Sequence, residues 1–81
     1  MTAEEELAAA IDGRADWQME GAAAIYAPPA ATAQVRVQAM ATPSRTVRFA
    51  ATIIRNGRAE HTRPAATAVE AVRWAEQVRL G

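Results

Sequence analysis

Residues 47–63 read VRFAATIIRNGRAEHTR and hold the clearest structural pattern in the chain. Apolar residues at positions 47, 49, 51 and 53 recur with the period of two that is typical of a strand with one buried face. Asn56-Gly57 follows directly and favours a two-residue hairpin turn with positive φ at both positions. Residues 58–63 are therefore expected to return as a short polar edge strand, which Pro64 closes.

The register of this hairpin is ambiguous. A two-residue turn pairs Ile53 with Glu60 and Ala51 with Thr62, which places a carboxylate opposite a core residue. Two solutions stay open. Either the loop is longer, or the other face of the strand (Ala50, Thr52 and Ile54) is turned toward the helices.

The flanking segments add two more elements. Apolar and polar residues alternate over 34–41, which predicts a strand that ends at the turn residues Thr42-Pro43-Ser44-Arg45. Thr67 and Glu70 have the spacing of a capping box, and an apolar stripe over 68–79 predicts an amphipathic helix behind it. Within that helix, Trp74 widens the apolar stripe.

The N-terminal part is expected to begin with an acidic helix over 3–12, capped by Thr2 and Glu5 and stopped by Asp12-Gly13. Residues 15–27 fit both a strand and a helix, and Gly21 favours the strand. The predicted fold class is α+β over a single domain, residues 1–81. It consists of a three- or four-stranded antiparallel sheet with a short acidic helix at the start and a C-terminal helix packed on one face.

The amino-acid composition indicates how stable the protein can be and in which compartment we expect it. Of the 81 residues, 22 are alanine and none is cysteine, so the core is thin and has no disulfides. Pairing of two copies is a common remedy, and Met40 and Ile54 on a sheet face predict a homodimer. No stretch approaches the roughly 18 apolar residues of a membrane span, and the acidic start does not resemble a signal peptide. We therefore expect a cytoplasmic protein of a bacterial host cell, with no membrane partner.

Catalysis is not expected. His61 is the only histidine and Ser44 the only serine, which leaves little for nucleophilic or acid–base chemistry. One histidine and scattered acids give no metal-ligand spacing, and single glycines form no phosphate-binding loop. The sequence predicts no enzyme activity, no metal and no cofactor.

The two signs of charge are segregated along the chain. Residues 1–20 carry six acids and one arginine, a formal −5, and residues 21–81 carry eight arginines and three acids, a formal +5. Such polarity predicts a surface that meets charged partners.

The arginines suggest one function. Arg36, Arg48, Arg55, Arg58 and Arg63 lie on or near the predicted hairpin. The segment from Arg45 to Arg79 resembles the arm-binding domains of phage-type integrases, in which a three-stranded sheet backed by a helix enters the DNA major groove. That resemblance implies a small DNA-binding module in which Arg48 and Arg63 would be offered to DNA. A strong net positive field usually accompanies duplex binding, and this chain is neutral overall.

The acids suggest another function, which the sequence favours. In size, composition and helix–sheet–helix layout the chain is similar to the small phage-encoded anti-CRISPR proteins that act on type I effector complexes. The resemblance implies a non-enzymatic protein-binding inhibitor from a phage or mobile element that blocks target-DNA binding. The acidic residues would stand in for DNA phosphates: Glu4, Glu5, Glu6, Asp12, Asp16 and Glu20. Changing the three consecutive glutamates to glutamine is expected to weaken partner binding and leave the fold intact.

Overall fold

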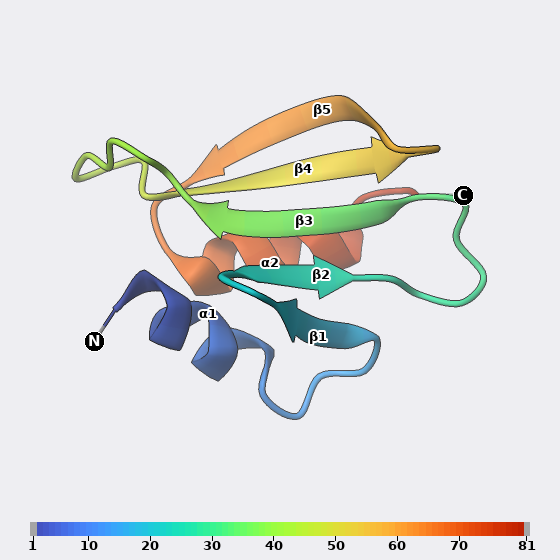
Figure 1. Cartoon of the computed structure of the whole chain (residues 1–81), viewed down its shortest axis with the longest axis horizontal. Coiled ribbons are helices and arrows are strands. Elements are labelled where there is room, and N and C mark those ends of the chain that lie inside the picture. Colours follow the sequence, from blue (N-terminus) through green and yellow to red (C-terminus); the bar gives the residue numbers. More distant parts are fainter. Residues whose placement is uncertain (1, 81) are drawn as a thin grey trace.

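Five antiparallel strands form one sheet whose spatial order follows the chain, β1-β2-β3-β4-β5 (Figure 1). The structure is a computed structural model that describes residues 2–80. Its elements are α1 (Ala3–Ile11), β1 (Trp17–Glu20), β2 (Ala23–Tyr26), β3 (Gln34–Ala39), β4 (Phe49–Arg55), β5 (Arg58–Ala65) and α2 (Ala68–Gln77). The predicted α+β class is confirmed: one helix precedes the antiparallel sheet in the chain and another follows it.

The strand count is five, and not three or four, because the ambiguous segment 15–27 forms a hairpin of its own. β1 pairs with β2 through Trp17↔Tyr26 and Glu20↔Ala23, and β2 joins the main sheet beside β3. Gly21 in the connecting turn has φ +62°, a conformation that glycine adopts without strain. The helix alternative for residues 15–27 is therefore wrong, and the strand alternative is confirmed.

A β-bulge at Glu60 resolves the register of the β4–β5 hairpin. Asn56 and Gly57 form the expected two-residue turn, with φ values of +52° and +77°. Pairing is regular up to Ile54↔Ala59, and the next pair is Ile53↔His61. Both solutions offered from the sequence are wrong, since the loop has two residues and Phe49, Ala51 and Ile53 remain the buried face. One extra residue in β5 takes the carboxylate out of the ladder.

Several boundaries differ from the predicted ones. β5 continues through Pro64 to Ala65, because an edge strand tolerates a residue without an N–H. β3 ends at Ala39 and α2 at Gln77, each two residues early. The Thr67 hydroxyl accepts from the Glu70 N–H as predicted, whereas the Glu70 carboxylate accepts from the Ala66 N–H and does not complete a capping box.

Both helices pack on one face of the sheet. α1 contacts β1, β2 and β3, α2 contacts β3, β4 and β5, and the two helices touch each other. The fully buried large side chains between these layers are Phe49, Leu7, Val35, Val37 and Val72. Alanines 68, 71 and 75 of α2 are also buried, and small side chains there let the helix approach the strands closely.

The other face of the sheet carries no helix. Ile25 belongs to this bare face, between Gln18 and Arg36 of the neighbouring strands, and is only 5% exposed. Arg36 lies opposite Ile25 on one side and Thr52 on the other. The Nε atom of Arg36 is buried without a hydrogen-bond acceptor in the described part of the chain.

Candidate protein-interaction surfaces

The charge segregation seen along the sequence becomes a separation across the sheet. In a meander, the first and last strands are the two edges, and each helix lies over its own half. The acidic N-terminal residues therefore gather around α1 and β1. The C-terminal arginines 58, 63 and 73 lie at the opposite side, on β5 and α2.

Five of the six predicted acidic residues form what we call the acidic edge: Glu4, Glu5, Asp12, Asp16 and Glu20. All five residues are exposed, and they lie on α1, on β1 or in the connection between them. Asp16 has φ +69° in that connection, a conformation in which Asp and Asn are enriched. The Glu5 carboxylate also accepts from the Thr2 N–H, and this cap lowers the Glu5 pKa below its ordinary value.

Glu6 has a structural role instead. Its Oε1 lies 2.6 Å from Arg48 Nη2, and its Oε2 accepts from the Ala68 N–H at 3.0 Å. It thereby joins α1 to the segment before β4 and to the first residue of α2. The Arg48 hydrogen bond, and after it the Ala68 N–H, lower the pKa of the Glu6 carboxyl against the opposing effect of burial. Because this contact is tertiary, changing Glu6 should cost more than the lost interaction with the helix dipole, and whether the triple glutamine variant keeps its fold stays a prediction.

The five arginines proposed for DNA do not share one face. Arg48 pairs with Glu6 and stacks over the Phe49 ring, with its guanidinium carbon 5.2 Å from the ring centroid. Arg55 pairs with Glu60 at 2.7 Å and donates to the Thr32 hydroxyl. Arg36 lies on the bare face, whereas Arg63 is opposite Ala51 on the helix-covered face. Arg58 is exposed at the start of β5.

A third ion pair connects α2 to the β1 side of the molecule. Glu76 accepts from Arg14 at 2.6 Å with one carboxylate oxygen and from the Trp17 indole at 3.0 Å with the other. Trp17 in turn stacks on Tyr26, with ring centroids 4.9 Å apart. This cluster engages Arg14, the one arginine of the acidic N-terminal segment, in an exposed ion pair within the chain.

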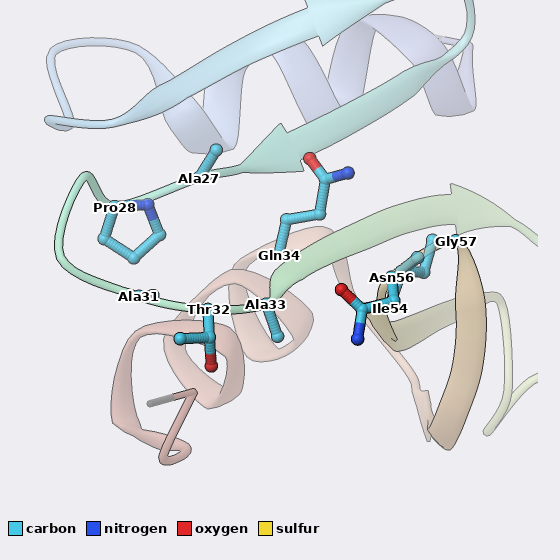
Figure 2. Close-up of a pocket in the computed structure, with 9 residues that line it drawn as sticks. All are labelled: Ala27, Pro28, Ala31, Thr32, Ala33, Gln34, Ile54, Asn56 and Gly57. Carbon is cyan, nitrogen blue, oxygen red and sulfur yellow. The ribbon is translucent and has the colours of Figure 1, made fainter.

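Three hollows can be distinguished on the surface of residues 2–80; the third, about 260 Å³ in volume, lies between the β2–β3 connection and the segment after α2. Figure 2 shows the first, about 240 Å³ in volume, between the β2–β3 connection and the β4–β5 turn. Its walls are loop residues and the amides of Gln34 and Asn56, and none of its lining residues is ionisable. The second, about 320 Å³, lies between α2 and β5 and includes Arg63, Arg73 and Trp74.

Sequence reasoning overlooked the second hollow. It treated Trp74 only as a residue that widens the apolar stripe of the helix. The contact that would have indicated the hollow joins residues distant in sequence, since His61 on β5 lies against Trp74 with ring centroids 6.0 Å apart. Only the bulge places His61 on the helix-covered face, so the strand pattern alone did not reveal this contact.

Residues with catalytic potential have ordinary surroundings. The Ser44 hydroxyl accepts from the Val47 N–H in the β3–β4 connection, and His61 is exposed beside Trp74. Among residues 2–80, no group of three or more His, Cys, Asp or Glu side chains is placed to hold a metal ion. Neither described helix has the length and apolarity needed to cross a bilayer. Comparisons with protein-family models, curated proteins and solved structures found no match to this chain.

Proposed function

We propose that this protein is a non-enzymatic, protein-binding inhibitor that covers a basic, DNA-contacting surface of its target with the acidic edge. The observation that carries the proposal is how the acids are used. Glu6, Glu60 and Glu76 form the three ion pairs found within residues 2–80. The five acids of the acidic edge form none within these residues, although all five are exposed on α1, on β1 or in the connection between them.

The scaffold supports this use of the acidic edge. Leu7 and Ile11 anchor α1 in the core, so the exposed Glu4 and Glu5 in its first turn belong to a fixed helix. Negative charges on a fixed element attract a cationic surface and raise the association rate, an effect that salt screens. Acidic side chains held in this way can take the place of phosphates.

The acidic edge and the resemblance to anti-CRISPR proteins together suggest a target that can be tested. The resemblance implies that such inhibitors occupy a basic, DNA-contacting surface of the type I effector complex, where an acidic protein would prevent DNA binding. The source of such an inhibitor would be a phage or another mobile element.

The experiment measures binding of this protein to a purified type I effector complex, and the complex's binding to target DNA, over a series of salt concentrations. The test variant carries E4Q, D12N, D16N and E20Q, which remove four charges and keep Glu5 and Glu6 in their structural contacts. A matched control carries R45Q, R58Q and R79Q, three exposed arginines outside the acidic edge. We expect the test variant alone to bind more weakly and with a flatter salt dependence.

Two results would reject the proposal. One is that the four-charge variant inhibits DNA binding by the effector complex as strongly as the wild-type protein does at every salt concentration. The other is direct binding of the protein to duplex DNA that R36Q, R58Q and R63Q abolish. That second result would establish the DNA-binding alternative, since these three arginines have no ion-pair partner among residues 2–80.

A further inference from the structure

The hollow between α2 and β5 has the composition of a binding site and lies across the sheet from the acidic edge. Its lining residues are Arg63, Thr67, Val69, Glu70, Arg73, Trp74 and Gln77. Arg63 comes from the helix-covered face of β5, and the others from α2 or its cap. Because β5 is the last strand, no further element covers this side of the sheet within the described residues.

The hollow has a basic wall. Neither Arg63 nor Arg73 lies within ion-pair distance of an acid in residues 2–80, while Arg14, Arg48 and Arg55 all do. Glu70 at one end is held by the Ala66 N–H. Two arginine forks with no carboxylate of their own can each receive a carboxylate from outside in bidentate geometry.

The hollow also has apolar surface. Trp74 is half-buried and packs on His61. Its indole N–H has no acceptor among residues 2–80, whereas that of Trp17 donates to Glu76. Val69 is 44% exposed and is one of two exposed large hydrophobic residues among residues 2–80. Tryptophan and arginine are the residue types that contribute most to protein interfaces when they lie together in a pocket.

We infer that this hollow binds an acidic peptide segment of a protein partner. The partner places an apolar side chain against Trp74 and Val69, and carboxylates on Arg63 and Arg73. A nucleic acid fits less well, because the hollow presents one acid for two arginines and the chain has no net positive charge. This inference concerns a surface separate from the acidic edge and does not depend on the proposed function.

The test follows the two indole N–H signals by NMR during titration with synthetic peptides. The main probe is a short peptide of glutamates around one central leucine. Three others serve for comparison: one with serine in place of leucine, one with lysines in place of glutamates, and a single-stranded oligothymidylate. W17F assigns the Trp74 signal. We expect the glutamate–leucine peptide to shift the Trp74 signal and to leave that of Trp17 in place.

Variants then identify the contacts. R63Q and R73Q should each weaken binding about tenfold, the effect of losing one charge-assisted pair. The matched controls R58Q and R79Q remove exposed arginines of β5 and of the segment after α2 that do not line the hollow, and should change binding less than twofold. The inference is overturned if the peptide leaves the Trp74 signal unmoved, if the lysine peptide binds equally well, if oligothymidylate binds in preference, or if the controls weaken binding as much as R63Q.

Discussion

Replacing Glu6 by glutamine should destabilise the protein far more than replacing Glu4, its neighbour on the same helix. Glu6 receives two hydrogen bonds from Arg48, at 2.6 and 3.4 Å, and one from the Ala68 N–H at 3.0 Å. Charge-assisted hydrogen bonds contribute about 1.5–3 kcal/mol when shielded, and exposed ion pairs about 0.2–1 kcal/mol. The Glu6 and Arg48 side chains are 25% and 40% exposed. Their contact is therefore neither fully shielded nor fully exposed, and its contribution should lie where these two ranges meet.

We therefore expect E6Q to lower the free energy of unfolding by about 1–2 kcal/mol, because glutamine keeps an acceptor but loses the charge. For a domain of this size that corresponds to a fall in Tm of roughly 4–16 °C, measured by circular dichroism. E4Q removes an equal charge from the same turn without a tertiary partner and should change Tm little. R48Q combined with E6Q should cost less than the sum of the two single changes, since both break one contact.

The pH dependence gives a second test of the same contact. The folded-state pKa of Glu6 is lowered, so its contribution to stability is present above the unfolded value of about 4.3 and is lost as pH falls through the folded pKa. The stability difference between wild type and E6Q should thus be full at neutral pH and disappear in acid. Equal Tm values for E6Q and E4Q at neutral pH, or a difference that persists at about pH 2, would refute this account of Glu6.

Four further outcomes are expected. Deleting Glu60 removes the bulge and keeps Ile53 opposite His61, so the NOEs between these two residues should persist. The lost ion pair with Arg55 is exposed and should lower the free energy of unfolding by less than about 1 kcal/mol. Gly57→Ala should lower the free energy of unfolding, measured in urea, by about 1–2 kcal/mol. The loss comes from the φ of +77° alone, because the added Cβ meets nothing within 4 Å, so D-alanine at this position should restore stability. Trp74→Ala should lower the free energy of unfolding by about 1.5–2.5 kcal/mol, half the value for a fully buried aromatic residue; a loss near 4 kcal/mol would mean that it belongs to the core. Pairing of two copies stays a prediction: light scattering should give a dimer mass at tens of micromolar that Ile54→Gln reduces, and a monomer mass for the wild type would exclude it.

Local signals in the sequence predicted most of the main elements. Thr2 and Glu5 do form a capping box, and Asn56-Gly57 does form a two-residue turn, because each depends on residues at most three apart. The alternation of Phe49, Ala51 and Ile53 correctly marked the buried face of β4. The first hairpin was missed, since its strands have only four residues each and such short segments show no clear period.

The position and use of the charges depended on partners distant in sequence. Every residue of the acidic edge could be named from the sequence, and so could their separation from the arginines. Yet Glu6 differs from Glu4 only because Arg48 and Ala68, 42 and 62 residues away, come to rest beside it. The α2–β5 hollow likewise exists because a single bulged residue turns His61 and Arg63 toward the helix. Capping and turn formation depend on bonds within a few residues, whereas register, ion pairing and hollows depend on how the sheet brings distant segments together.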